Sequence, residues 1–268
     1  MSGWLEVCRA AAGDVQGVLA RLPTRVEREP VVGDGVGGDE TTAIDAEAER
    51  AVVARLDATG ADFTLVSEEL GIRPPRVGTS SNVVVVDPID GSINAKRGIP
   101  FFSLSIAVAD GPEMGDVSFG YVFDFGSGEE WTARRGEGAF LDGRPLAPVQ
   151  PRERIELLSL EATRTDLVVA HGPSLAALAR RVRVMGSLAL SLCHLAAGRF
   201  DAVCSLKPAR SVDIAAGQLL VAEMGLVVEL PDDGALAAAP LDLEGRSRIV
   251  AAATHEHAKQ VVAALRQL

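Results

Sequence analysis

The sequence predicts a mixed α/β protein whose first half is α+β and whose second half is α/β. Two helical patterns followed by closely spaced strands occupy the first half, whereas short apolar runs alternate with helical patterns in the second. The pattern of predicted elements changes from one type to the other across residues 145–151, a stretch with a proline at each end. We therefore expect two domains, over residues 1–145 and 146–268, that meet near this stretch.

The first predicted elements are two helices joined by a glycine-rich loop. Residues 4–21 carry apolar side chains at helical spacing, and Pro23 closes this helix. Residues 32–40 contain four glycines, so we expect a solvated loop there. Thr41 or Thr42 can cap the next helix, which is expected to run to about residue 59.

The strands of the first half follow this second helix. Residues 63–67 predict a short strand, and a loop is expected over residues 71–81. The unbroken run from Val83 to Val86 is typical of a strand that is buried on both faces. Apolar alternation predicts three further strands, antiparallel to one another, over residues 101–109, 117–125 and 130–133.

Glycines and short apolar runs define the alternation of the second half. Gly186-Ser187 can open a helix of about 11 residues that ends at Gly198, and Gly225 stops the helix that begins at Asp213. Two more helices are predicted over residues 173–180 and 255–268. Six strands are predicted, over residues 157–160, 167–170, 181–185, 200–206, 226–230 and 248–253.

Composition indicates a folded protein with a large core. Hydrophobic residues make up 47% of the 268 residues and the mean hydropathy is +0.20, which excludes global disorder. The net charge of −11 argues against a nucleic acid as a partner. Cys8, Cys193 and Cys204 form no C-x-x-C pair and are expected to be buried free thiols. Because no apolar run could span a membrane and no signal-peptide pattern begins the chain, we expect a cytoplasmic protein without a membrane partner.

Two aspartates follow the predicted valine strand where it ends. Pro88 prevents a simple continuation of the strand, so Asp87 and Asp90 lie at one rim, beside a turn-forming cluster that contains Gly91 and Ser92. Mg²⁺ is usually held between one or two carboxylates and a substrate phosphate. On spacing alone, however, an Asp-Pro-x-Asp-Gly string is more often only a turn.

Three further acidic residues bear on whether this segment forms a metal site or only a turn. Glu68 and Glu69 end a predicted strand, where adjacent acids are usually surface residues. Asp213 lies in the first turn of a helix, where the helix dipole alone favours an aspartate. The combination of these acids with the Asp-Pro-x-Asp-Gly turn is much less ordinary than any one of its parts.

Three stretches together resemble the inositol monophosphatase family of metal-dependent phosphatases. They are SEEL at 67–70, VDPIDGSINAKRGIP at 86–100 and VDIAAG at 212–217, in the family's order and at about its spacing. The resemblance continues through residues 119–133 and 181–202, so it covers nearly the whole chain. NAKRGIPFFSLSI and GGDETTAIDAEAE are most similar to the archaeal-type branch, which hydrolyses both fructose 1,6-bisphosphate and inositol monophosphate.

This resemblance implies a layered αβαβα sugar-phosphatase fold and a homodimer, with the site between the two halves of the chain. It implies a Mg²⁺-dependent phosphomonoesterase for inositol monophosphate, fructose 1,6-bisphosphate or both, in which metal-activated water attacks the phosphate. Two or three Mg²⁺ ions are implied, for which Mn²⁺ can substitute. The implied metal ligands are Glu68, Asp87, Asp90, Asp213, the carbonyl of Ile89 and, as an outer ligand, Glu69. Asp45 and Ser92 match the pair that orients and deprotonates the water, and Glu68 shares in catalysis.

A further set of residues is expected to contact the substrate, of which Gly186 and Ser187 match the region that lines the substrate hydroxyl groups in relatives. The full set is Asp90, Gly91, Ser92, Asn94, Arg183, Gly186, Ser187, Lys207 and Asp213. The backbone N–H groups of Gly91 and Ser92 can cradle a phosphate if they open a helix. Arg183 and Lys207 either meet a second phosphate or are exposed structural charges.

The chain departs from the family's usual pattern in three places. Ser92 stands where Thr is usual, which keeps the hydroxyl group. Val212 stands where Trp or Tyr commonly precedes the last aspartate. The mobile-loop lysine of many relatives has no evident counterpart in residues 32–40, which leaves loop closure and a third metal open.

Two alternatives stay open at this point. A 3′-phosphoadenosine 5′-phosphate phosphatase of the same family is usually longer, and no adenine-stacking segment stands out among one Tyr and two Trp. A non-catalytic regulatory protein on the same scaffold is the other, because a fold does not guarantee an activity. Such a protein would not need all four core carboxylates together with Asp45 and Ser92.

Overall fold

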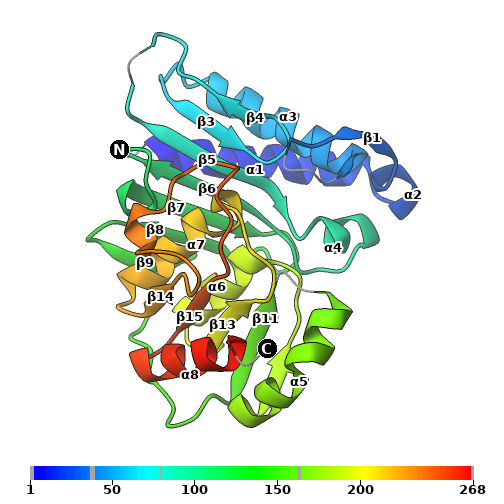
Figure 1. The fold of residues 1–268 in the computed structure, drawn as a ribbon. Coiled ribbons are helices and arrows are strands. Elements are labelled where there is room, and N and C mark those ends of the chain that lie inside the picture. Colours follow the sequence, from blue (N-terminus) through cyan, green and yellow to red (C-terminus); the bar gives the residue numbers. More distant parts are fainter. Residues whose placement is uncertain (1–2, 37–39, 79, 162–163, 267–268) are drawn as a thin grey trace.

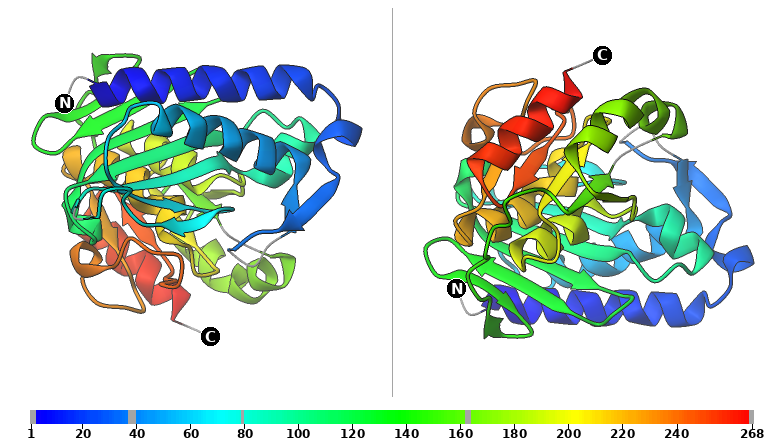
Figure 2. Two further views of the ribbon diagram at one scale, coloured as in Figure 1. Left: turned by 90° about the horizontal axis from the view of Figure 1, so that it is seen from above. Right: turned by 90° about the horizontal axis from the view of Figure 1, so that it is seen from below.

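The structure is a stack of alternating helical and sheet layers (Figure 1). The computed structural model describes residues 3–36, 40–78, 80–161 and 164–266. Figure 2 shows one helix pair on each outer face, with a third pair between the sheets. The pairs are α1 (Gly3–Arg21) with α3 (Ala43–Asp57), α6 (Leu188–Ala196) with α7 (Ser211–Glu223), and α5 (Thr165–Leu178) with α8 (His255–Leu265). The mixed α/β class and the layered αβαβα architecture are thus confirmed.

The larger sheet has eight strands, and all its neighbours are antiparallel except β3 and β5. Its spatial order is β10 (Arg144–Pro145), β9 (Gly138–Leu141), β8 (Glu130–Arg134), β7 (Val117–Asp124), β6 (Ser103–Ala109), β5 (Val83–Asp90), β3 (Thr64–Ser67) and β4 (Gly71–Arg73). The three antiparallel strands predicted after residue 100 are confirmed as β6, β7 and β8.

The smaller sheet has five strands, of which β11 pairs in parallel with both of its neighbours. Its order is β12 (Arg181–Arg183), β11 (Leu157–Glu161), β13 (Ala202–Ser205), β15 (Val250–Ala252) and β14 (Val227–Glu229). Short elements complete the chain: α2 (Arg25–Arg28), α4 (Ser92–Arg97), the 3₁₀ turns Met114–Asp116 and Leu236–Ala238, and the pair β1 (Val31–Asp34) with β2 (Glu40–Thr42).

The valine run of β5 faces two different apolar cores. Val84 and Val86 pack in the core that α1 and α3 cover, whereas Val83 and Val85 pack in the core built around α6 and α7. Both faces of the strand are therefore dry, which explains why the run does not alternate with polar residues. The three cysteines are free and buried, as expected. No helix in the described part of the chain is long and apolar enough to cross a membrane.

Three local expectations are wrong. Residues 167–170, predicted as a strand, belong to α5, because Leu167, Val168 and Leu175 pack as one helical face in the core beneath the smaller sheet. The expected loop over residues 32–40 contains most of β1 and the start of β2, and its residues 37–39 lie outside the described part of the chain. β4 occupies the start of the loop expected over residues 71–81, where antiparallel pairing with β3 supplies its hydrogen bonds.

Candidate active site

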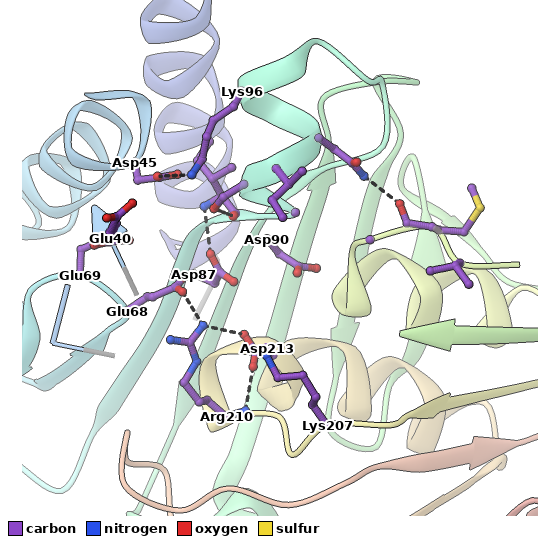
Figure 3. A pocket seen from close by; sticks show the side chains of 18 residues that line it. Glu40, Asp45, Glu68, Glu69, Asp87, Asp90, Lys96, Lys207, Arg210 and Asp213 are labelled. Atoms are coloured by element: carbon purple, nitrogen blue, oxygen red, sulfur yellow. Dashed lines mark hydrogen bonds and ion pairs between the residues drawn. The ribbon is translucent and has the colours of Figure 1, made fainter. Parts of the chain in front are cut away.

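One pocket of about 790 Å³ gathers most of the predicted site residues (Figure 3). It lies where the end of β5 and the starts of α4 and α7 meet residues 184–186. Every predicted metal ligand lines it. The predicted residues in its wall are Asp45, Glu68, Glu69, Asp87, Ile89, Asp90, Gly91, Ser92, Asn94, Gly186, Lys207 and Asp213.

β5 carries its two aspartates past Pro88 into this pocket. The strand continues to Asp90, and a bulge between Asp87 and Asp90 interrupts its pairing with β6. The prediction that the strand ends at Asp87 is therefore wrong, because the bulge accommodates a proline that has no N–H to donate. The Ile89 N–H donates to Asp87 Oδ1 at 3.0 Å. The two aspartates are only 2% and 8% exposed, so their carboxylates reach the pocket from a nearly dry strand end.

The turn after β5 packs tightly against the segment that precedes α6. Gly91 has a φ of +96° at the start of α4, and a Cβ at this position would lie 2.9 Å from the carbonyl oxygen of Gly186. Asn94 donates from Nδ2 to the carbonyls of Phe101, at 2.7 Å, and Met185, at 2.8 Å. In this structure the Asn94 amide thus ties the turn to the opposite wall.

The first turn of α6 fixes Asp90. Its Oδ2 accepts hydrogen bonds from Ser187 Oγ at 2.5 Å and from the Ala189 N–H at 2.7 Å. Ser187 is fully buried and is not among the residues that line the pocket, so the structure does not bring this predicted substrate contact to the cavity. Its hydroxyl instead holds Asp90 and accepts from the Leu190 N–H at the helix start.

Asp45 presents one oxygen that no described group satisfies. Its Oδ2 accepts from the backbone N–H of Thr42 at 3.2 Å and from the Thr42 hydroxyl, and Lys96 Nζ lies 3.9 Å from the same oxygen. Asp45 Oδ1 is buried and has no hydrogen-bond partner within the described residues. A buried polar atom of this kind indicates a missing water or ion. Ser92, which lines the same pocket, donates from Oγ to the Ile89 carbonyl at 3.0 Å.

Sequence reasoning missed Arg210, which lines the pocket, and Glu161, which lines an adjoining cavity of about 280 Å³. Arg210 is 8% exposed; its guanidinium contacts Glu68 and lies 3.6 Å from Asp213 Oδ1. Glu161 is buried on β11 and accepts the N–H groups of Met185, at 3.2 Å, and Gly186, at 2.8 Å. The sequence signals were weak, because a basic residue before a helix and an acid at a strand end are both common on surfaces.

Burial and mutual repulsion raise the pKa values of the central carboxyl groups. Desolvation is the largest cause for Glu68, Asp87 and Asp90, and neighbouring carboxylates add to it. The pKa of Glu68 and the pKa of Asp90 rise to about 7, and the pKa of Asp87 rises well above its usual value. Arg210 opposes the pKa shifts of Glu68 and Asp87. A cation bound among these groups would favour their ionised forms in the same way.

The donor set fits hard divalent cations in its chemistry and charge, because carboxylate and carbonyl oxygens are what Mg²⁺ prefers. Asp45 Oδ1, which has no partner among the described residues, adds an unsatisfied acceptor at the same pocket. Within the described ranges, however, no three acidic, histidine or cysteine side chains converge closely enough to hold an ion as they stand. Figure 3 shows the guanidinium of Arg210 bonded to Glu68 and Asp213, two of the predicted ligands.

The predicted second-phosphate contacts lie in different places. Arg183 is exposed on β12 and lines a separate cavity of about 200 Å³, so the structure does not bring it to the candidate site. Lys207 lines the candidate pocket and also an adjoining cavity of about 280 Å³, which has Arg246 in its wall.

Comparisons with known proteins point to the family that the sequence resembles. A family model described as the inositol monophosphatase family matches residues 4–268. A fructose-1,6-bisphosphatase/inositol-1-monophosphatase of Methanothermobacter thermautotrophicus is 34% identical over 270 residues, which cover 93% of this chain and 96% of that protein. Nus factor SuhB of Pasteurella multocida is 34% identical over 204 residues, 71% of each chain. The crystal structure of an inositol monophosphatase–fructose 1,6-bisphosphatase matches with a TM-score of 0.85 and 27% identity, over 97% of this chain and 99% of its own.

Proposed function

This chain belongs to the inositol monophosphatase family, a family of phosphatases, and from that premise we propose that it is a Mg²⁺-dependent phosphomonoesterase. The proposed substrates are inositol monophosphate, fructose 1,6-bisphosphate or both. This range is supported by the dual name of the Methanothermobacter relative, which matches over nearly its whole length.

The charge of the pocket is the observation that carries this proposal. Among the residues that the structure describes, seven acidic side chains line the pocket, against three basic ones: Glu40, Asp45, Glu68, Glu69, Asp87, Asp90 and Asp213, against Lys96, Lys207 and Arg210. A phosphate monoester carries up to about two negative charges at neutral pH. It would be repelled from this lining unless bound cations reversed the local charge. Two or three Mg²⁺ ions would do so, and Mn²⁺ suits the same oxygen ligands.

The proposed metal ligands come from three segments that meet at the pocket. They are the carboxylates of Glu68, Asp87, Asp90 and Asp213, the carbonyl of Ile89 and, further out, Glu69. When bound, the ions would neutralise phosphate oxygens, activate a water molecule and stabilise the departing alkoxide.

Asp45 and Ser92 are proposed to orient the water and receive its proton. Asp45 already uses Oδ2 to accept from Thr42, which leaves Oδ1 as the oxygen that can accept a proton. Ser92 Oγ donates its own hydrogen to the Ile89 carbonyl, so its lone pairs can accept a hydrogen bond from the water. Held between these two groups, the water would be oriented for attack in line with the leaving oxygen.

The substrate is proposed to bind through backbone groups and flanking charges. The N–H groups of Gly91 and Ser92 lie at the start of α4 and are proposed to bind phosphate oxygens. Lys207 lies in the wall and supplies a positive charge for a second phosphate. The carboxylates of Asp90 and Asp213 are proposed to accept from substrate hydroxyl groups, next to the Gly186 backbone.

The test is phosphate release by the purified protein with and without Mg²⁺. The panel contains fructose 1,6-bisphosphate, inositol 1-phosphate and 3′-phosphoadenosine 5′-phosphate. Mg²⁺-dependent turnover of either of the first two supports the proposal, whereas no turnover of any sugar phosphate refutes it. A clear preference for the nucleotide would favour the nucleotide phosphatase instead.

A regulatory protein on the same scaffold is the second candidate, because the relative from Pasteurella multocida is named as a Nus factor. The two candidates differ in what they need from the pocket. A regulatory protein would show no phosphate release even when Mg²⁺ binds, and its function would survive the loss of Ser92 or Asp45.

A further inference from the structure

Hydrogen bonds hold the backbone of Arg210 and of its neighbour in place. Its neighbour Ala209 forms two backbone hydrogen bonds with Ser247, at 2.8 and 3.1 Å. Its own N–H donates to Asp213 Oδ2 at 2.7 Å, at the first turn of α7. The backbone at Arg210 is thus held on both sides, and its long side chain carries the guanidinium into the pocket.

The guanidinium binds the same carboxylates that are proposed as metal ligands. It contacts Glu68 Oε1 and lies 3.6 Å from Asp213 Oδ1 (Figure 3). Lys96, another cation in the wall, pairs with Asp45 instead. An arginine stays protonated at any pH at which the protein is folded, so it can leave these carboxylates only by moving.

We propose that Arg210 is an internal counter-cation that competes with the metal for Glu68 and Asp213, so that metal binding displaces its guanidinium and Arg210 sets the metal affinity of the site. The inference rests on the proposed function only in assuming that the site binds a divalent cation. It explains why the described acidic side chains do not converge on a metal-sized space as they stand.

Electrostatics gives this arrangement two opposite effects. In the metal-free protein, the guanidinium offsets the repulsion among buried carboxylates and so stabilises the folded state. When a divalent cation approaches, the same positive charge repels it and holds two of its ligands. Removing the charge should therefore weaken the metal-free fold and strengthen metal binding.

The displaced side chain has space to move into. The cavity of about 280 Å³ beside the main pocket has Arg210 in its wall, so the guanidinium can swing there while the backbone stays in place. The buried carboxylate of Glu161 lines the same cavity and offers a second anion to the displaced charge. The movement would therefore take the guanidinium from Glu68 towards Glu161.

The test is calorimetric titration of Mg²⁺ into the EDTA-stripped full-length protein, wild type against Arg210→Met. Methionine keeps much of the length and loses the charge. We expect the dissociation constant to fall about tenfold in the variant, the effect of removing about one competing charge-assisted hydrogen bond, that to Glu68. In thermal unfolding, we expect a lower Tm without metal and a larger Tm gain on adding Mg²⁺.

Lys207→Met is the matched control, because it removes one positive charge from the same wall but leaves the contacts with Glu68 and Asp213 in place. Its dissociation constant should change much less than that of Arg210→Met. If metal-free Arg210→Met does not fold, Arg210→Lys is titrated instead, since its shorter side chain keeps a charge but loses the fork, and it should also bind Mg²⁺ more tightly than wild type.

Mg²⁺ binding by the Arg210 variant that is equal to or weaker than that of the wild type would overturn the inference. Arg210 would then organise the ligands rather than compete for them. An equal tightening in Lys207→Met would also overturn it, since overall charge would be the cause. If the wild type itself binds no divalent cation, the proposed function fails first and this inference fails with it. The two failures are therefore distinguishable from the wild-type titration alone.

Discussion

If the proposed Mg²⁺ ions bind, lowering the pH from 8 to 6 is expected to remove much of the stability that they add to the fold. The pKa of Glu68 rises from 4.5, and the pKa of Asp90 from 3.8, to about 7 in the metal-free fold. Both groups are ionised in the unfolded chain throughout this range, but in the metal-free fold they take up protons as the pH falls through 7. Protonation therefore stabilises the metal-free fold, whereas Mg²⁺ requires the ionised carboxylates.

The size of the effect follows from the distance between the pH and the pKa. At pH 6, one unit below a pKa of about 7, releasing each proton to make room for the metal costs about 1.4 kcal/mol, whereas at pH 8 the cost is close to zero. Two such groups lower the Mg²⁺-dependent part of the free energy of unfolding by about 3 kcal/mol.

Urea unfolding at pH 8, 7 and 6, with EDTA or with saturating Mg²⁺, measures this difference. The pKa values of His171 and His194 are lowered, mainly by burial, so both cost stability as the pH falls through 6.5. That cost is the same with and without metal, so it cancels in the difference. Glu49→Gln is the matched control, because Glu49 is a buried carboxyl group with a raised pKa that lies outside the proposed ligands. A Mg²⁺ contribution that stays constant or grows between pH 8 and pH 6 would refute this reasoning.

Substitutions at three further positions test the roles of Ser92, Gly91 and Glu161. Ser92→Ala should lower kcat about a hundredfold or more, while Ser92→Thr keeps the hydroxyl and most of the activity; equal kcat values in the two variants would remove the hydroxyl from the mechanism. Gly91→Ala should destabilise the fold by about 1–3 kcal/mol, because φ is +96° and Cβ would meet the Gly186 carbonyl; an unchanged Tm would argue against that close approach. Glu161→Gln should cost about 1–3 kcal/mol in the free energy of unfolding, because an amide cannot accept from all the donors on Glu161. It should also raise KM more than it lowers kcat. Wild-type KM and stability would show that Glu161 does not position Gly186.

The carboxylates of the pocket could be named from the sequence because three stretches resemble one family, and several of them also lie near the ends of regular elements. Glu68 follows β3, Asp87 follows the valine run of β5, and Asp213 lies in the first turn of α7. Strand ends and helix starts at one edge of a layered fold come together in space. For these residues, the position within a predicted strand or helix already indicates that they lie near one another in the fold.

Roles that depend on tertiary contacts could not be predicted in this way. Asn94 belongs to a turn-forming cluster, but its amide binds the carbonyls of Phe101 and Met185, the latter 91 residues away. Arg210 is buried beside Glu68, which stands 142 residues earlier in the chain. No local pattern distinguishes either residue from an ordinary turn or surface residue, because the partner that defines its role is distant in sequence.

Phosphate release by Asp87→Asn and Asp213→Asn, compared with wild type at saturating Mg²⁺, tests the central claim most directly. The claim is that these buried carboxylates hold the cations on which hydrolysis depends. Each variant should lose about a thousandfold or more of the Mg²⁺-dependent rate on the best substrate of the panel, while its circular dichroism spectrum stays that of the wild type. Full Mg²⁺-dependent activity in either variant would contradict the claim.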